Sequence, residues 1–337
     1  MLPAILACSG PALTDNERAF FRAADPAGYI LFARNVAGRA QVKALTESLR
    51  DLSGRADLPI LIDQEGGRVA RLRPPEWPAF PAPGRFAALY EKAPISGQEA
   101  ARANGEALAV TLAELGINVD CLPLLDVAQP GAHDIIGDRA LGAEPMRVAA
   151  LGRAILDGLA AGGVCGIVKH IPGHGRARAD SHQELPVVEA SEEELAIDLA
   201  PFRALADAPM AMTAHVLYPA WDPERPATVS PTIISEVIRG EIGFTGLLMS
   251  DDLAMAALSG TLAERTAAAL AAGCDLALHC SGVLAESEEV AGAAGEMSAA
   301  ASERLGRAMA GIAGRASAKS FEELAAKRDA LLAYLRG

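Results

Sequence analysis

Residues 168–182 hold the densest group of side chains that could do chemistry in this chain. Residues 168–175 (VKHIPGHG) are followed by Asp180, Ser181 and His182, so three of the six histidines fall in this stretch. Asp180 and His182 lie two residues apart, and a carboxylate at that spacing can orient an imidazole to act as a general acid or base. The alternative is a glycine-rich surface loop with incidental histidines, because Pro and Gly loops are common connectors.

Polar residues also stand where several apolar runs end. The run 166–168 reads as a buried strand that delivers Lys169 and His170 to a rim, where a Pro/Gly loop ends it. Six such runs end in or beside polar groups, namely Asp63, Asp126, Lys169 with His170, His215, Asp251 with Asp252, and His279. Each alone has a plainer explanation, since Asp126 could cap a loop and His215 or His279 could be a hydrogen-bonded core residue.

The elements that position these groups alternate along the chain. Eight apolar runs are candidate strands, at residues 3–8, 29–32, 59–63, 117–125, 166–170, 210–215, 246–251 and 275–280. Helical patterns lie between them, at residues 14–24, 39–52, 97–115, 145–161, 191–206, 231–242 and 261–272. Continuously apolar strands that alternate with helices indicate a parallel sheet covered on both faces.

Eight strand and helix units predict an α/β fold, namely a single (β/α)₈ TIM-type barrel with extra C-terminal helices. We expect residues 1–337 to form one domain, with helices at residues 283–296, 299–312 and 321–335 packed outside the barrel. Residues 73–85, which contain five prolines, are expected to form a stiff loop over one end of the barrel. In this architecture, catalytic groups gather where the strands meet the following loops.

Composition narrows the function classes. The formal net charge is -13 and no Lys/Arg cluster occurs, which argues against a nucleic-acid partner. Five separated cysteines without metal-binding spacing are expected to be reduced core residues. Residues 5–8 (ILAC) superficially resemble a lipoprotein cleavage box but lack a positively charged segment before them, and no run is long enough to span a bilayer. We therefore expect a cytoplasmic protein.

Four motifs in one order carry a family resemblance. With residues 63–68 (DQEGGR), 169–175 (KHIPGHG), 180–182 (DSH) and 250–253 (SDDL), the sequence resembles family-three glycoside hydrolases. More narrowly, it is similar to their single-domain bacterial β-N-acetylglucosaminidases, over about residues 28–280. The resemblance implies a retaining enzyme that removes a non-reducing terminal β-N-acetylglucosamine, from (anhydro)muropeptides in peptidoglycan recycling.

The resemblance also implies roles for single residues. Asp251 corresponds to the nucleophile, His182 to the general acid/base and Asp180 to the carboxylate paired with it. Five positions correspond to residues that hold the sugar hydroxyls, namely Asp63, Arg71, Arg139, Lys169 and His170. Donor-only cations beside a carboxylate that accepts hydroxyl protons suit a pyranose ring.

The remaining expectations concern partners. The resemblance implies no metal and no organic cofactor. The expected partner is a small carbohydrate substrate, a GlcNAc-anhydroMurNAc muropeptide, with no nucleic acid or membrane involved, and we expect a monomer. Two other readings stay open at this point: a glycoside phosphorylase on the same scaffold, since a His acid/base would not repel phosphate, and a non-catalytic sugar-binding barrel.

Overall fold

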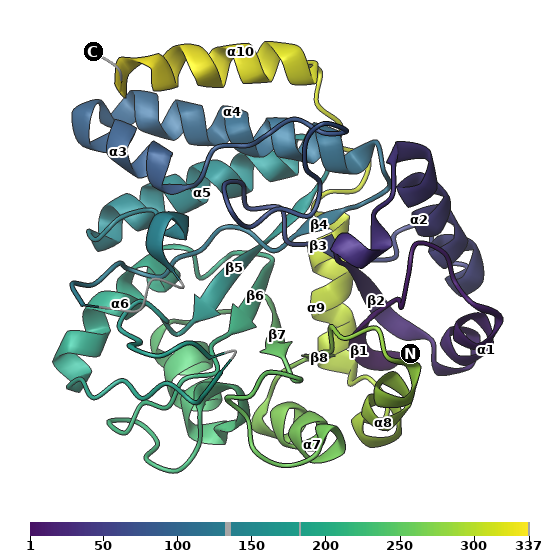
Figure 1. Cartoon of the computed structure of the whole chain (residues 1–337). Helices are drawn as coiled ribbons and strands as arrows, with labels where there is room; N and C mark the ends of the chain where they lie inside the picture. The colour runs from purple at the N-terminus through teal and green to yellow at the C-terminus, as the bar shows by residue number, and fades with distance from the viewer. Residues whose placement is uncertain (132–135, 182, 336–337) are drawn as a thin grey trace.

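Eight parallel strands close into a barrel in the computed structural model, which describes residues 1–131, 136–181 and 183–335. Neighbouring strands follow chain order, and β8 pairs with β1 to complete the ring (Figure 1). The strands are β1 (Leu2–Ala7), β2 (Pro26–Leu31), β3 (Ile60–Ile62), β4 (Val119–Asp120), β5 (Cys165–Ile171), β6 (Met210–Thr213), β7 (Leu247–Asp252) and β8 (Leu276–Leu278). The predicted (β/α)₈ barrel is confirmed.

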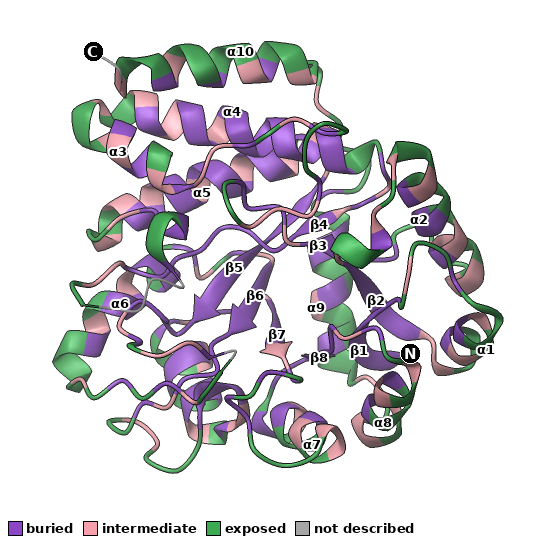
Figure 2. Cartoon of the chain, viewed as in Figure 1, coloured by how far each residue is buried: buried purple, intermediate pink, exposed green. Residues whose placement is uncertain are grey.

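The strands are apolar because both of their faces are covered. Leu6 and Leu31 belong to the cluster that packs against the outer helices, whereas Ile5 and Ile30 belong to the cluster inside the barrel. Every residue of β1, β2 and β5 is buried, and buried residues line the ring in Figure 2. Continuous apolar runs are what this two-sided burial requires.

Helices surround the barrel, and side-chain caps fix where several of them begin. The side chains of Thr14, Ser191 and Thr261 each accept a hydrogen bond from a backbone N–H in the first turn, and the backbone N–H of each of these residues donates to the side chain of the Glu three residues later. The helices up to the last strand are α1 (Asp15–Ala24), α2 (Arg39–Ser53), α3 (Gly84–Lys92), α4 (Pro94–Ala113), α5 (Pro145–Ala161), α6 (Glu192–Ala204), the π-helix η4 (Ile233–Glu241) and α7 (Leu262–Ala272).

Several elements differ from their predicted bounds by up to three residues, and two differ more strongly. The run at residues 117–125 yields only the two-residue strand β4, because the N–H of Leu122 turns back to the carbonyl of Asp120 at 2.8 Å and interrupts the regular ladder. Helix α3 was not predicted, because its first residues, Gly84 and Arg85, were assigned to the proline-rich loop that precedes it.

The C-terminal helices occupy three different places. They are α8 (Leu284–Ala294), α9 (Ala299–Ala310) and α10 (Phe321–Leu332). Helix α10 lies along α4, while α9 crosses behind the strands in Figure 1. Arg304 of α9 binds Asp275 just before β8, and Arg307 donates to the carbonyl of Thr245 just before β7. Helix α9 therefore covers the amino ends of the strands, where its apolar side chains join the cluster inside the barrel.

The remaining fold observations concern cysteines and hydrophobic length. All five cysteines are free and buried, as expected for core residues. In the described parts of the chain, no helix combines the length and the apolar character needed to cross a bilayer.

Candidate active site

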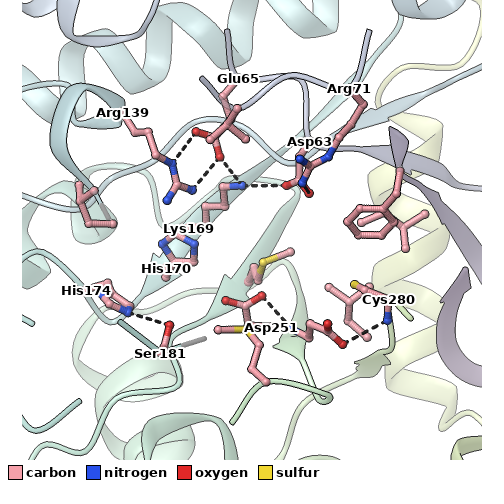
Figure 3. Close-up of a pocket in the computed structure, with 18 residues that line it drawn as sticks. Asp63, Glu65, Arg71, Arg139, Lys169, His170, His174, Ser181, Asp251 and Cys280 are labelled. Atoms are coloured by element: carbon pink, nitrogen blue, oxygen red, sulfur yellow. Dashed lines mark hydrogen bonds and ion pairs between the residues drawn. The ribbon is translucent and has the colours of Figure 1, made fainter. Parts of the chain in front are cut away.

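A cavity of about 390 Å³ lies at the carboxyl ends of the strands (Figure 3). Asp63 directly follows β3, and Lys169 and Asp251 come from the last residues of β5 and β7. The lining residues are Ile30, Phe32, Asp63, Glu65, Val69, Arg71, Ile136, Arg139, Lys169, His170, His174, Ser181, Met212, Asp251, Asp252, Met255, Leu278 and Cys280. The cavity thus combines an apolar base with converging polar groups, as small-molecule sites do.

One side of the cavity is a continuous chain of ion pairs, which we call the charged wall: Arg71, Asp63, Lys169, Glu65 and Arg139. Arg71 Nη2 lies 3.0 Å from Asp63 Oδ2, and Lys169 Nζ lies 3.1 Å from Asp63 Oδ1. Glu65 continues the chain, with its Oε1 2.8 Å from Lys169 Nζ and 2.8 Å from Arg139 Nη2. The wall holds three cations and two carboxylates, so its formal charge is positive.

The ion pairs favour the charged forms of Asp63, Glu65 and Lys169. Burial alone would raise the pKa of Asp63, but the Lys169 and Arg71 cations outweigh burial and leave this pKa below its usual value. Burial would also raise the pKa of Glu65, but the Lys169 and Arg139 cations leave it below its usual value. Burial would lower the pKa of Lys169, yet the two carboxylates raise it above normal. The wall therefore offers charge-assisted donors and acceptors to a polar ligand at neutral pH.

A glycine turn shapes the loop that carries Glu65. Gly66 has φ +94°, and a Cβ there would lie 2.3 Å from the carbonyl oxygen of Pro81. The N–H of Gly67 donates to the carbonyl of Phe80 at 2.9 Å, so the loop is held against the proline-rich segment. Only glycine fits this close approach at positive φ, which accounts for the Gly-Gly pair of the DQEGGR motif.

Asp126 holds two histidines at the cavity. Its Oδ2 lies 2.7 Å from His170 Nδ1, and its Oδ1 accepts the backbone N–H groups of His170 and His174 at 3.2 and 2.7 Å. Because a carboxylate can only accept, Nδ1 of His170 carries a proton. Burial would raise the pKa of Asp126, but the facing imidazoles lower it to about 2. Asp126 is therefore an orienting group rather than only a loop cap.

His174 is a buried neutral imidazole at the cavity edge. Its Nε2 lies 3.3 Å from Ser181 Oγ, and its ring centroid lies 5.6 Å from that of His170. Burial and the neighbouring His170 lower the pKa of His174 to about 4, although Asp126 and Asp251 act in the opposite direction. The unfolded chain binds a proton at this residue below about pH 6.5, whereas the folded chain does not until about pH 4.

Stability should consequently fall as the pH drops from about 6.5 toward 4 and stay level, for this residue, above that window. At pH 5 the free energy of unfolding should be lower than at neutral pH by about 2 kcal/mol because of His174, at roughly 1.4 kcal/mol per pH unit below 6.5. We expect His174→Gln to flatten the pH dependence of Tm between pH 7.5 and 5, measured by circular dichroism. Ser181→Ala, which keeps the imidazole, should retain the wild-type slope. Equal slopes for His174→Gln and wild type would contradict a neutral buried His174.

Asp251 faces the cavity from the end of β7. Its Oδ1 accepts the N–H of Asp252 at 2.8 Å. Burial would raise the pKa of Asp251, but the imidazoles of His215 and His170 and this N–H favour the charged form, so the pKa lies below its usual value. An ionised, partly desolvated carboxylate at a strand end is suited to act as a nucleophile.

His215 and Asp252 hold the end of β7 through hydrogen bonds to its backbone and to the following residues. His215 Nε2 lies 3.0 Å from the carbonyl oxygen of Asp252, so this nitrogen carries the proton, and Nδ1 accepts from the Thr228 hydroxyl at 2.7 Å. Asp252 Oδ1 accepts the N–H groups of Ala254 and Cys280, both at 3.1 Å. The hydrogen-bonded-core reading of His215 is therefore confirmed.

His279 is likewise a bonded core residue. Its Nε2 lies 2.8 Å from Ser281 Oγ and 3.3 Å from Glu286 Oε2, and its side chain is fully buried. Burial lowers the pKa of His279. It does not line the cavity.

The predicted site residues fall into three groups. Six lie together around the cavity: Asp63, Arg71, Arg139, Lys169, His170 and Asp251. Asp180 lies instead in a neighbouring hollow of about 320 Å³, where Gln183 Nε2 donates to its Oδ2 at 3.2 Å. His182 lies outside the described residues.

Glu65 is a site residue to which sequence reasoning gave no role. It stands within the DQEGGR motif, but nothing in the sequence signals that its carboxylate joins Lys169 to Arg139, residues 104 and 74 positions away along the chain. The alternation of the motif offered a weak signal, since Asp63 and Glu65 are two residues apart and can project to the same side.

A closed (β/α)₈ barrel with ionised and hydrogen-bonding groups converging at the carboxyl ends of its strands defines an enzyme that handles a small polar substrate. Three comparisons identify which kind. The model of the glycosyl hydrolase family 3 N-terminal domain matches residues 7–309. A β-hexosaminidase from Bordetella avium (strain 197N) is 40% identical over 283 residues, which span 82% of this chain and 80% of that protein.

Solved structures agree. A family 3 β-N-acetylglucosaminidase from Paenibacillus sp. superposes with a TM-score of 0.86 at 32% identity, covering 98% of this chain and 66% of that chain. NagZ from Neisseria gonorrhoeae in complex with N-trifluoroacetyl-D-glucosamine superposes with a TM-score of 0.84 at 32% identity, covering 98% and 96%. The chain belongs to glycosyl hydrolase family 3, and it is a glycoside hydrolase. The resemblance seen in the four motifs is confirmed.

Proposed function

We propose that this enzyme is a retaining exo-glycosidase that removes a terminal β-N-acetylglucosamine through a covalent glycosyl-Asp251 intermediate. The observation that carries the proposal is that Asp251 lines the same cavity as the charged wall and His170. A carboxylate nucleophile facing a set of hydroxyl-binding groups is the arrangement that a retaining mechanism needs. The β-hexosaminidase and β-N-acetylglucosaminidase names of the relatives support the sugar.

The proposed roles follow from donor and acceptor chemistry. Arg71, Lys169 and Arg139 can only donate, so they suit sugar hydroxyl oxygens, while Asp63 can accept hydroxyl protons. Asp251 attacks the anomeric carbon as the bond to the leaving oxygen breaks, and His182, paired with Asp180, gives that oxygen its proton. In the second step, the same histidine takes a proton from water, which then displaces Asp251.

The finer assignment is also a proposal. We propose a GlcNAc-anhydroMurNAc muropeptide as the substrate, turnover in peptidoglycan recycling, action as a monomer in the cytoplasm, and a single domain over residues 1–337. The five free, buried cysteines are compatible with a reducing compartment.

The test compares an aryl β-N-acetylglucosaminide with the matching β-glucoside, each with and without phosphate. The proposal predicts hydrolysis of the first, much slower hydrolysis of the second, and free sugar as the product in both buffers. A sugar 1-phosphate would instead assign a phosphorylase, and tight sugar binding without turnover would assign a binding protein. Equal rates on both glycosides would contradict recognition of the acetamido group.

A further inference from the structure

Glu65 is the most buried member of the charged wall. Its side chain has no exposed surface, although it borders the cavity. Both carboxylate oxygens are used: Oε1 accepts from Lys169 Nζ and Arg139 Nη2, and Oε2 accepts from Arg139 Nε, all at 2.8 Å. A carboxylate occupied in this way has little capacity left to bind a substrate itself.

These contacts fix the directions in which Lys169 can donate. An ammonium group has three N–H bonds in tetrahedral geometry. Asp63 takes one at 3.1 Å and Glu65 takes a second at 2.8 Å, so the direction of the third is set by geometry. The Lys169 side chain is almost fully buried, so a swing of the ammonium group away from the two carboxylates would leave a charge unpaired.

Arg139 is fixed in a different manner. Glu65 binds the guanidinium edge-on through Nε and Nη2, a bidentate pairing that stops rotation of the planar group. The opposite edge of the plane then faces one constant direction. One carboxylate thereby sets the orientation of two cations from distant parts of the chain. Arg139 lies in the segment before α5, and Lys169 lies in β5.

We infer that Glu65 is a positioning residue for sugar recognition, which aims Lys169 and Arg139 at the substrate without touching it. The inference rests on the proposed function and deepens it. Preorganised donors lose no orientation energy when a substrate binds, and they act on the transition state at full strength. Loss of Glu65 should therefore weaken substrate recognition by Lys169 and Arg139 even in a protein that still folds.

The first test is Glu65→Gln, assayed on an aryl β-N-acetylglucosaminide. The amide keeps one acceptor but turns an NH₂ group toward a cation, so we expect kcat/KM to fall about 10- to 100-fold, with KM raised. Glu99→Gln is the matched control, because Glu99 is a partly exposed carboxylate of α4 that pairs with Lys327 and Arg102 at the surface. The control should keep wild-type kinetics.

The second test is a mutant cycle. If Glu65 acts only through its two cations, Glu65→Gln should change kcat/KM by less than about twofold in a Lys169→Met, Arg139→Met background, where nothing remains to be positioned. A direct contact between Glu65 and the substrate would instead lower kcat/KM tenfold or more in that background, and would overturn the inference.

The cycle also covers poor folding of the single variant. Glu65→Gln leaves Arg139 without its carboxylate and leaves Lys169 paired with Asp63 alone. In the double variant the buried Glu65 has neither cation and takes up a proton, so the double and the triple variants both carry a neutral group at position 65 and can be compared even when the single variant does not fold. If the wild type is active and Glu65→Gln keeps the same kcat/KM, this inference is overturned while the proposed function stands. A wild type that hydrolyses no aryl β-N-acetylglucosaminide would overturn the proposed function, and the inference with it.

Discussion

Asp251→Asn is expected to lower kcat by at least about 10⁴-fold, since loss of the proposed nucleophile removes the covalent route. The fold should survive, because the amide oxygen can still accept the N–H of Asp252. Steady-state kinetics on an aryl β-N-acetylglucosaminide, with Tm measured alongside, provides the check. Asp207→Asn, at a well-exposed carboxylate that pairs with Arg153, should keep both activity and Tm.

A second readout names the nucleophile directly. A 5-fluoro-glycosyl fluoride of N-acetylglucosamine should react fast, because fluoride leaves readily, and then hydrolyse slowly, so that the glycosyl ester accumulates. Peptide mass spectrometry should find the label on Asp251. A label on Asp252, or near-normal turnover by Asp251→Asn, would sink the assignment, although Asp252 borders the same cavity.

His182→Ala is expected to give the second-largest effect, and one that depends on the leaving group. A sugar alcohol leaves as a poor alkoxide and needs the proton, so turnover of a natural-type disaccharide should fall by about 10²- to 10⁴-fold. An acidic phenol needs less help, so glycosylation by an aryl substrate should survive better and deglycosylation should become the slow step. Added azide, which needs no general base, should then restore turnover and yield a β-glycosyl azide.

Under the proposed mechanism Asp180 orients the imidazole and does not carry the proton, so Asp180→Asn should show a milder form of this pattern. Equal losses on good and poor leaving groups, without azide rescue, would remove His182 from the acid/base role. His174 would then be the first candidate to replace it, since it lines the cavity as a neutral imidazole.

The fold could be predicted because strands that are buried on both faces need uninterrupted apolar runs, which are visible in the sequence. The runs that became β1, β5 and β7 were placed within about one or two residues of their observed bounds. Where prediction was wrong, backbone chemistry had overridden apolar character. A hydrogen bond from the N–H of Leu122 back to Asp120 interrupts β4, and the prolines before Gly84 masked the start of α3 in the sequence.

The site was harder to predict than the fold. Strand ends indicated which groups meet at the rim, so Asp63, Lys169 and Asp251 could be expected to converge. Composition carries no distances, however. It could not reveal that Glu65 joins Lys169 to Arg139, that Asp126 serves two histidines, or that Asp180 lies in a hollow beside the cavity. These features depend on how loops from different strands meet.

Helix α9 gives the barrel a closed floor. Leu305 and Met309 of this helix pack into the interior cluster at the amino ends of the strands, while the cavity lies at the carboxyl ends. Under the proposed function, a terminal sugar enters at the carboxyl ends of the strands and binds deepest in the cavity, and the aglycone lies between it and the opening. After bond cleavage the aglycone blocks the sugar's exit, so the two products must depart in sequence, the sugar being first in and last out. A blind-ended site of this kind admits chain ends and rejects chain interiors.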